Sequence, residues 1–371
     1  MDWLLVALAL YLGAMLHLIP RISRPTVPLG VSVPSDRLDD PAVTGALTRY
    51  RHLVVDVTVL CLVLGLVLAR VRVDLAFLIV PLVQLVLGAV AYVRTRRSII
   101  EAKHRHGWYV GVPVRVAASV TETSSGQVRW GWYALALAIG FAGLGYGISV
   151  YGRQPDPYPT HTGPRGVPDA WGPKTYWNVL GPQGIAIAMV LLFALLAWAV
   201  SIAPVRVLPD GDVAAGTRRA RSTRAITQWM LSTLVVVIAA GITIFEVQTW
   251  NGITGTPSVV AMVAFLGVTL GVCGVGVWKS VVLSTEQGQA QHEAATAARA
   301  QGRRPAPQSP DDDRFWKGGL LYDNPDDPSV FVPKRAGVGY TVNVGSLWGK
   351  VFLLALALLV LGSLLLPLLV H

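Results

Sequence analysis

Long runs of apolar residues alternate with polar segments along most of the chain. A helix needs about 20 mostly apolar residues to cross the roughly 30 Å hydrocarbon core of a bilayer. Eight runs meet this length: Trp3–Ile19, Leu53–Ala69, Leu75–Val93, Trp132–Tyr151, Gly184–Ala203, Ile226–Val247, Ser258–Val282 and Val351–Val370. The pattern predicts an all-α polytopic membrane protein with about eight transmembrane helices. Only Arg70 to Asp74 separate the second and third runs, which leaves room for a tight hairpin.

Composition agrees with this pattern. The chain has 371 residues, of which 53% are hydrophobic and 14% are charged, whereas soluble domains carry about a quarter charged residues. This deficit excludes an ordinary soluble enzyme. Cys61 and Cys273 both lie inside apolar runs, so we expect them to be packing residues rather than a disulfide or part of a thiolate metal site.

The basic residues predict the orientation of the helices. Alternate polar segments hold 25 Lys and Arg residues on one side and 5 on the other, and the basic side is normally the cytoplasmic one. Both chain ends are then expected outside the cell. Asp2 precedes the first run and Arg21 follows it, which predicts a retained helix rather than a cleaved signal peptide. The net charge of +10 is explained by this bias, so the expected partner is the lipid bilayer and not a nucleic acid.

Few ionisable groups fall within the predicted spans, where a charge costs about 2.5–3.5 kcal/mol. His17 and Asp56 lie near the predicted inner boundary, and Glu246 lies near the outer end of the sixth span. All three can extend toward the interface. Gln84 is the deepest strongly polar residue, and an interhelical hydrogen bond explains it. The sparse intramembrane chemistry disfavours an ion-coupled pump.

The segment from Gly152 to Gly181 is rich in proline and glycine, which predicts a compact, turn-rich external cap rather than a helix or a long strand. Four aromatic residues lie in it: Tyr158, Trp171, Tyr176 and Trp177. We expect Trp171 and the Tyr176–Trp177 pair near the lipid headgroups. His161 and Asp169 either pair with each other or contact a ligand, because one His and one Asp are too few for a metal site. A structural role and the recognition of a ligand or peptide are both compatible with this segment.

Residues of the same segment carry a family resemblance. The run Pro159-Thr160-His161 is followed by Gly166, by Pro168-Asp169, and by Trp171-Gly172 with Lys174. This order resembles the extracytoplasmic motif of SdpI-type bacterial membrane proteins, although Thr162 replaces the usual aromatic residue. The resemblance implies a bacterial inner-membrane protein that gives immunity to a secreted killing factor, or that signals by holding a transcriptional repressor at the membrane. The implied recognition residues are His161, Gly166, Pro168, Asp169, Trp171 and Lys174.

The polar segment between the last two spans divides into two parts. Residues 283–310 are rich in Ala and Gln; the first half can continue the seventh helix, and the Arg303-Arg304-Pro305 step should end it and leave a flexible cytoplasmic linker. Residues 311–346 alternate short apolar stretches with turn signals, which predicts a small cytoplasmic β-meander. Because about 35 residues cannot bury an independent core, we expect it to dock on the helix ends, with Phe315 and Trp316 facing the bundle or the lipid.

Acidic residues at the Asn324–Pro328 turn do not fit a calcium loop, because prolines occupy the third and sixth positions counted from Asp323. The segment resembles a second bacterial module of unknown function that often ends membrane proteins bearing the external loop. The residues expected to define this module are Trp316, Lys317, Tyr322, Asn324, Asp326, Asp327, Lys334 and Arg335.

Phosphate-binding, zinc-protease and serine-hydrolase motifs are not found in the sequence. We therefore expect a non-enzymatic protein without a cofactor. The resemblance to SdpI-type proteins implies a sensor or immunity-type regulator that meets a peptide toxin or envelope signal outside and a cytoplasmic regulator inside. A small-molecule or lipid transporter and an envelope scaffold are the alternatives. The domain boundaries expected from the sequence divide the chain into residues 1–151, 152–282, 283–310, 311–346 and 347–371.

Overall fold

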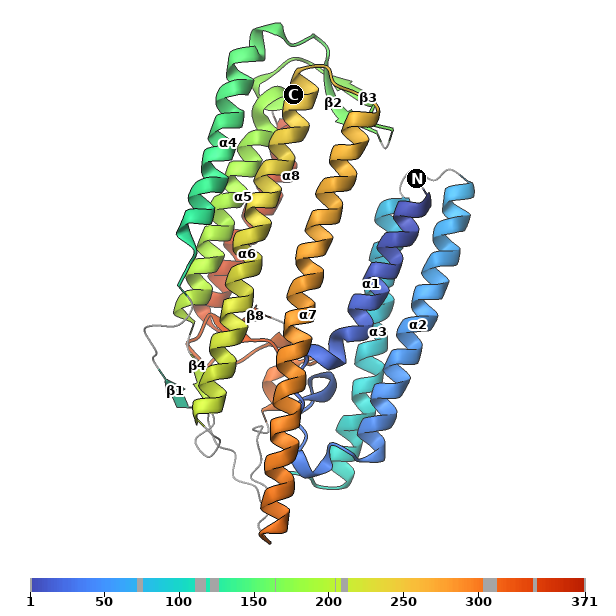
Figure 1. The fold of residues 1–371 in the computed structure, drawn as a ribbon, viewed down its shortest axis with the longest axis vertical. Helices are drawn as coiled ribbons and strands as arrows, with labels where there is room; N and C mark the ends of the chain where they lie inside the picture. The colour runs from blue at the N-terminus through green and yellow to red at the C-terminus, as the bar shows by residue number, and fades with distance from the viewer. Residues whose placement is uncertain are drawn as a thin grey trace. The chain divides into compact units, whose positions relative to one another are not determined.

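The computed structural model describes residues 2–71, 76–110, 118–120, 127–163, 165–203, 205–207, 213–302, 312–335 and 339–369. Most of these residues form helices (Figure 1): α1 (Asp2–Ile22), α2 (Pro41–Arg70), α3 (Ala76–Arg105), α4 (Trp130–Val150), α5 (Tyr176–Ile202), α6 (Val213–Trp250), α7 (Thr256–Ala300) and α8 (Leu347–Leu369). Among the described residues, seven helices are long and apolar enough to cross a membrane, and α8 adds a shorter apolar stretch, Leu347–Leu358. The predicted multi-pass helical architecture is confirmed.

Several helices extend beyond the apolar runs that predict them. Helix α2 begins at Pro41 rather than at Leu53, and α7 continues past Val282 to Ala300. Good helix formers such as Ala, Arg, Gln and Glu continue a helix after the apolar length is complete. Helix α7 thus includes the first part of the predicted linker, while residues 303–311 lie outside the described residues.

The chain divides into two compact units that cross the predicted domain limits. The first contains Met1–Glu122, Pro204–Thr223 and Val277–Gly349, and the second contains Thr123–Ala203, Arg224–Gly276 and Lys350–His371. Helix α4, which the sequence placed with the first three helices, belongs to the second unit. Apolar length predicts that a helix spans a membrane, but it does not predict which neighbours the helix packs against.

In the first unit, α1, α2 and α3 pack side by side (Figure 1). The Gln84 side chain of α3 is fully buried between them, and its Nε2 donates to the Ala9 carbonyl oxygen at 2.9 Å and to Thr58 Oγ1 at 3.3 Å. The predicted interhelical hydrogen bond is therefore confirmed. The predicted tight hairpin between α2 and α3 falls on residues 72–75, outside the described residues.

In the second unit, small residues let helices approach closely. A Cβ at Gly143 of α4 would lie 2.7 Å from Gln183 Nε2 of α5. Gln183 is itself fully buried, and its Nε2 donates to the Gly140 carbonyl oxygen and to Thr243 Oγ1 of α6, each at 2.9 Å. This amide joins three helices in the way that Gln84 does in the first unit. The sequence missed it because Gln183 precedes the predicted start of its span.

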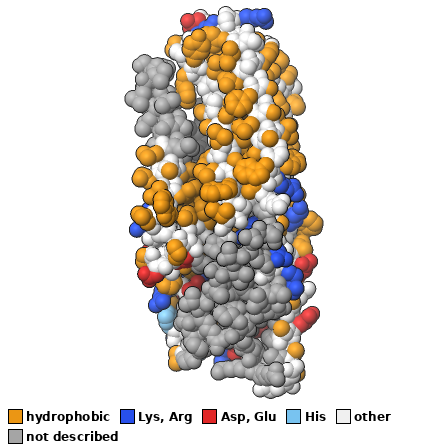
Figure 2. All heavy atoms as spheres, turned by 90° about the vertical axis from the view of Figure 1, so that its left-hand side faces the viewer, with side chains coloured by type: hydrophobic (Ala, Val, Ile, Leu, Met, Phe, Trp, Pro, Cys, Tyr) orange, Lys and Arg blue, Asp and Glu red, His pale blue; other side chains and the backbone are white. Residues whose placement is uncertain are grey.

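Apolar side chains on the outer helix faces are strongly exposed, as in Phe141 (57%), Leu191 (56%) and Val63 (54%). Figure 2 shows such side chains covering much of one helical face, with Lys and Arg side chains gathered beyond its ends. Water would penalise an apolar surface of this extent, whereas lipid tails accept it. The helices therefore contact the lipid bilayer.

Within the described residues, the strands form four two-stranded antiparallel sheets. Strand β1 (Ala118–Val120) pairs with β4 (Val205–Val207), and β2 (Tyr158–Thr162) pairs with β3 (Pro168–Gly172). The predicted external cap is therefore a β-hairpin, called here the His-Asp hairpin (residues 158–172). Its aromatic neighbours Tyr176 and Trp177 begin α5, which starts earlier than the predicted Gly184 because the Thr175 hydroxyl accepts from the Asn178 amide at 3.1 Å and caps the helix.

Residues 312–346, called here the C-terminal module, contain the remaining four strands. Strand β5 (Trp316–Lys317) pairs with β6 (Leu321–Tyr322), and β7 (Phe331–Pro333) pairs with β8 (Tyr340–Val342). A parallel bridge between Tyr322 and Asn343 joins the two hairpins. The predicted β module is confirmed, but its meander topology is wrong at β6 and β7. The two prolines of the Asn324–Pro328 turn lack the N–H groups needed to extend an antiparallel ladder.

Candidate functional site

The loop between α1 and α2 is unusually buried. Four of its apolar side chains are at most 3% exposed: Val27, Leu29, Val31 and Val33. Gly30 adopts φ +71°, and a Cβ there would lie 2.6 Å from Tyr92 Oη of α3 and 2.9 Å from the Gly319 carbonyl oxygen of the module. The loop is therefore enclosed between α3 and the C-terminal module, and only glycine fits at position 30.

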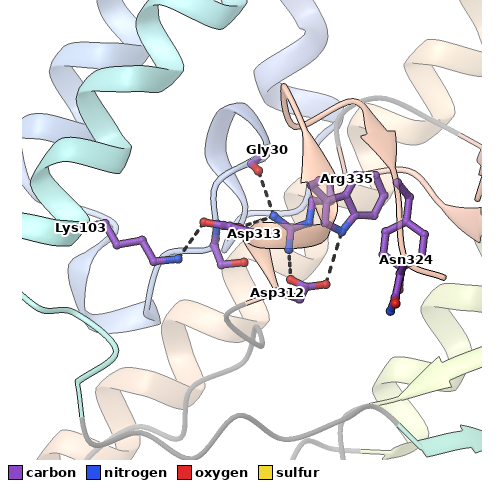
Figure 3. Close-up of polar contacts among 9 residues, drawn as sticks. Gly30, Lys103, Asp312, Asp313, Asn324 and Arg335 are labelled. Atoms are coloured by element: carbon purple, nitrogen blue, oxygen red, sulfur yellow. Dashed lines mark hydrogen bonds and ion pairs between the residues drawn. The ribbon is translucent and has the colours of Figure 1, made fainter. Parts of the chain in front are cut away.

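Arg335 lies at the centre of a polar cluster that joins the module to this loop (Figure 3). Its side chain is 5% exposed, its Nη1 donates to the Gly30 carbonyl oxygen at 3.0 Å, and it forms ion pairs with Asp312 and Asp313. The guanidinium lies 5.0 Å from the centre of the Trp316 ring. Burial lowers the pKa of Arg335, but the two carboxylates favour the charged form, which a guanidinium retains in proteins.

Asp313 extends the cluster to α3 and to the loop backbone (Figure 3). Its Oδ2 accepts from Lys103 Nζ at 2.7 Å, and its Oδ1 accepts from the Ser32 backbone amide at 3.0 Å. The Lys103 side chain is 7% exposed. Removing one member of a buried ion pair leaves an uncompensated charge and costs about 3–5 kcal/mol. Docking of the module therefore depends strongly on this one carboxylate.

Inside the module, Asn343 holds the Asn324–Pro328 turn. The residue is fully buried, and its Nδ2 donates to the carbonyl oxygens of Asn324 at 2.9 Å and Asp327 at 2.8 Å. Its Oδ1 accepts from the backbone amides of Asn324 at 3.1 Å and Gly345 at 3.0 Å. The amide thus uses both donors and its acceptor oxygen, and the predicted turn is confirmed.

The remaining predicted module residues divide between its interior and its surface. Trp316 and Tyr322 pack together at 5.1 Å between ring centres, and both are buried with Val332. The Trp316 ring lies between Tyr322 and the Arg335 guanidinium, 5.1 Å and 5.0 Å from its centre. The Tyr322 hydroxyl donates to Asp327 Oδ2 at 2.9 Å and accepts from Asn324 Nδ2 at 3.1 Å. The exposed residues are Lys317, Asp326 and Lys334.

The His-Asp hairpin brings its two named residues together. His161 Nδ1 and Asp169 Oδ1 are 2.5 Å apart, with 67% and 50% of the side chains exposed. Trp171, two residues further along β3, is 55% exposed. The sequence left open whether His161 and Asp169 pair with each other or contact a ligand. In the structure they pair with each other, on the hairpin that also carries the exposed Trp171.

Three further residues named for this segment have structural roles. Gly166 forms the turn at φ +71°, where a Cβ would lie 2.2 Å from the Gly255 carbonyl oxygen, and Pro168 begins β3. Lys174 Nζ donates to the carbonyl oxygens of Gly152 at 3.2 Å and Gln154 at 3.0 Å. Lys174 therefore stabilises the base of the hairpin through these two hydrogen bonds and is not part of the His161–Asp169 pair.

Below the hairpin lies a buried aromatic layer. Tyr158 is 1% exposed and packs with Val179 and Trp250, and burial raises its pKa. Trp250 Nε1 of α6 donates to the Val179 carbonyl oxygen of α5 at 3.1 Å, and Gln154 Nε2 donates to the Trp250 carbonyl oxygen at 3.2 Å. The hairpin is thus held on a rigid base, which fixes the position of its exposed pair.

The intramembrane polar residues named from the sequence are divided between the two units. Gln84 is buried in the first unit, the exposed Asp56 lies on α2 of that unit, and the partly buried Glu246 lies in α6 of the second unit. Within the described residues, no group of three His, Cys, Asp or Glu side chains is arranged to hold a metal ion.

Sequence reasoning missed most of the residues around Arg335. Asp313 and Lys103 are 210 residues apart, and Ser32 and Asp313 are 281 apart. The acidic run that ends at Asp313 is visible in the sequence. A single sequence, however, gives no pattern that predicts which distant residue pairs with a given charge. Asn343 was likewise missed because a single Asn between apolar residues gives no periodic signal.

Two family comparisons match parts of the chain. Residues 138–187 match a domain of unknown function (DUF1648), and this range includes the whole His-Asp hairpin. Residues 325–350 match a family of unknown function (DUF5808), which covers Asp326, Asp327, Lys334, Arg335 and Asn343 but begins after Trp316 and Asn324. Comparison with curated proteins and with solved structures found no match. The chain is thus a multi-pass membrane protein that carries segments similar to two families of unknown function.

Proposed function

We propose that the chain is a non-enzymatic membrane regulator of the sensor or immunity type. In this proposal the His-Asp hairpin faces the envelope and meets a peptide or envelope signal. The C-terminal module faces the cytoplasm, and its release from the loop between α1 and α2 is the output that a cytoplasmic regulator reads. The resemblance of the hairpin to SdpI-type proteins supports this role, and the module supplies the regulated contact.

The observation that carries the proposal is the polar character of the docking contact. The buried Arg335 and Lys103 side chains form ion pairs with the partly buried carboxylates of Asp312 and Asp313. Buried ion pairs give little net stability, because desolvation offsets most of their attraction, yet they fix a geometry strictly. In this proposal the ion pairs make the docked position of the module specific, and the docked and released states are close in free energy. Such a near-balanced element is what a signal can shift.

The exposed residues of the His-Asp hairpin also support the proposed role in recognising a signal. An exposed His–Asp pair beside an exposed Trp171 offers a charged group and an apolar surface together on a fixed base. Peptide recognition commonly combines an aromatic anchor with charged neighbours. No described observation favours transport, since the Gln84 amide is fully buried and bonded to Ala9 and Thr58.

The topology is tested with reporter fusions placed after Arg165 in the hairpin and after Asp326 in the module. The proposal requires the two reporters to report opposite compartments. If both lie in the same compartment, signalling from the hairpin to the module is contradicted.

The role is tested in a strain that lacks the gene, screened for sensitivity to secreted antimicrobial peptides and complemented with variants. The combined change His161→Ala, Asp169→Ala and Trp171→Ala should abolish the response at an unchanged protein level. The control, Arg165→Ala with Val167→Ala, removes two exposed side chains of the same hairpin and should leave the response intact. Full activity of the triple variant would exclude the hairpin as the recognition site.

A further inference from the structure

A pocket of about 560 Å³ lies between α2 and α3 of the first unit and has no role in the proposed function. It is lined by Thr48, Arg49, His52, Leu53, Asp56, Arg94, Thr95 and Ser98. Every one of these residues belongs to a helix that is long and apolar enough to span a membrane. The pocket thus places two arginines and a histidine on the flank of a helix pair that contacts lipid.

The polar side of the pocket suits a phosphate group. Arg49 and Arg94 come from different helices, both are exposed, and both line the same pocket. Arginine presents a planar fork of donors that matches phosphate oxygens. Arg49 Nε donates to the Gly45 carbonyl oxygen at 3.4 Å, which orients its guanidinium along α2. Asp56 is the only acidic residue in the lining, so the charge balance of the pocket favours an anion.

The apolar side of the pocket continues along the same two helices. Spacings of three and four residues place Leu60, Val63 and Val67 on the face of α2 that carries Leu53 and Asp56. The corresponding face of α3 continues from Ser98 and Arg94 through three further side chains: Val90, Val86 and Leu82. All six apolar side chains are between 40% and 57% exposed. A basic pocket therefore opens onto a strip that is apolar along its length.

We infer that this pocket binds the phosphate headgroup of an anionic phospholipid, whose acyl chains lie along the apolar strip of α2 and α3. A free phosphate compound would use the arginines but not the strip, whereas a phospholipid uses both. Basic pockets between membrane helices commonly bind anionic lipid headgroups. This pocket has the same combination of basic residues and a lipid-facing helix surface. Asp56 lies nearest to the apolar strip among the charged lining residues of α2, and it weakens the attraction for the phosphate.

The inference is tested by native mass spectrometry of the purified full-length protein in detergent, titrated with phosphatidylglycerol, with phosphatidylcholine and with free glycerol phosphate. We expect one phosphatidylglycerol to bind about 10-fold more tightly than phosphatidylcholine. The combined change Arg49→Ala and Arg94→Ala should remove this preference, and Asp56→Asn should strengthen it by removing the opposing charge.

The matched control is Arg97→Ala with Arg105→Ala, which removes two exposed arginines of α3 that do not line the pocket. It should keep the preference for phosphatidylglycerol. An equal loss in both double variants would show general electrostatic attraction and overturn the inference. Equal binding of the two phospholipids, or binding of glycerol phosphate as tight as that of phosphatidylglycerol, would overturn it as well. The Asp56→Asn variant guards against misfolding, because non-specific lipid binding by a damaged protein would not increase the preference for phosphatidylglycerol over phosphatidylcholine.

Discussion

The His-Asp hairpin contains a hydrogen-bonded pair, His161 and Asp169, and the C-terminal module contains ion pairs centred on Arg335, but the two lie in different surroundings. His161 and Asp169 are 67% and 50% exposed, whereas Arg335 is 5% and Asp313 is 18% exposed. Exposed pairs contribute about 0.2–1 kcal/mol and stay accessible to other molecules. Buried pairs contribute specificity of position and are costly to break on one side. The hairpin pair is thus suited to meet a ligand, and the module cluster is suited to hold a docked state.

The strongest test of this comparison is Asp313→Ala. It leaves Arg335, Lys103 and the Ser32 amide without this carboxylate, and it should weaken docking of the module by about 3 kcal/mol or more. We expect faster hydrogen exchange in residues 315–335 and at Ser32. Asp326→Ala, in the same module but exposed, is the control and should change nothing. Unchanged exchange in the Asp313 variant would mean that apolar contacts hold the module.

A smaller effect is expected from Gly30→Ala, which tests the enclosed loop without touching a charge. The new Cβ would collide with Tyr92 Oη and the Gly319 carbonyl oxygen, and φ +71° disfavours any side chain. We expect a loss of about 1–3 kcal/mol in stability, measured by thermal unfolding of the full-length protein. Gly45→Ala in α2, where a Cβ would meet nothing within 4 Å, should be neutral or slightly stabilising. Equal melting of the two variants would contradict the tight packing of Gly30.

The smallest effect on stability is expected from His161→Ala and Asp169→Ala. Because both side chains are mostly exposed, each single change should alter the free energy of unfolding by no more than about 1 kcal/mol. A double-mutant cycle in thermal unfolding measures the coupling between them. A large coupling energy would mean that the pair holds the hairpin together, and its proposed role in recognition would lose its support.

Elements whose signal is local could be predicted well. The Asn324–Pro328 turn follows from its prolines and acidic residues, and the helices follow from apolar runs of membrane length. Gln84 was correctly assigned an interhelical bond, because an amide in an apolar span has few other partners. Gln183 makes the same kind of bond, but the predicted start of its helix was too late to reveal it.

Elements that depend on distant partners could not be predicted. The three residues of β1 pair with β4, near residue 206, and strand propensity alone carries no information on the partner. The meander prediction failed because β6 and β7 do not pair; the two hairpins are joined instead by the backbone bridge between Tyr322 and Asn343, 21 residues apart. The cluster around Arg335 combines segments from the beginning, the middle and the end of the first unit.

The sequence by itself determined that this chain is a multi-pass helical membrane protein with a turn-rich segment and a small β module, because bilayer thickness and turn chemistry act over short stretches of chain. The tertiary structure alone decided that Asp313 joins Arg335 to Lys103, that Gly30 is enclosed against Tyr92, and that Arg49 and Arg94 share a pocket. The attraction between two charges depends on their distance in space and not on their separation in the sequence. Their partners are therefore fixed only when the helices have packed.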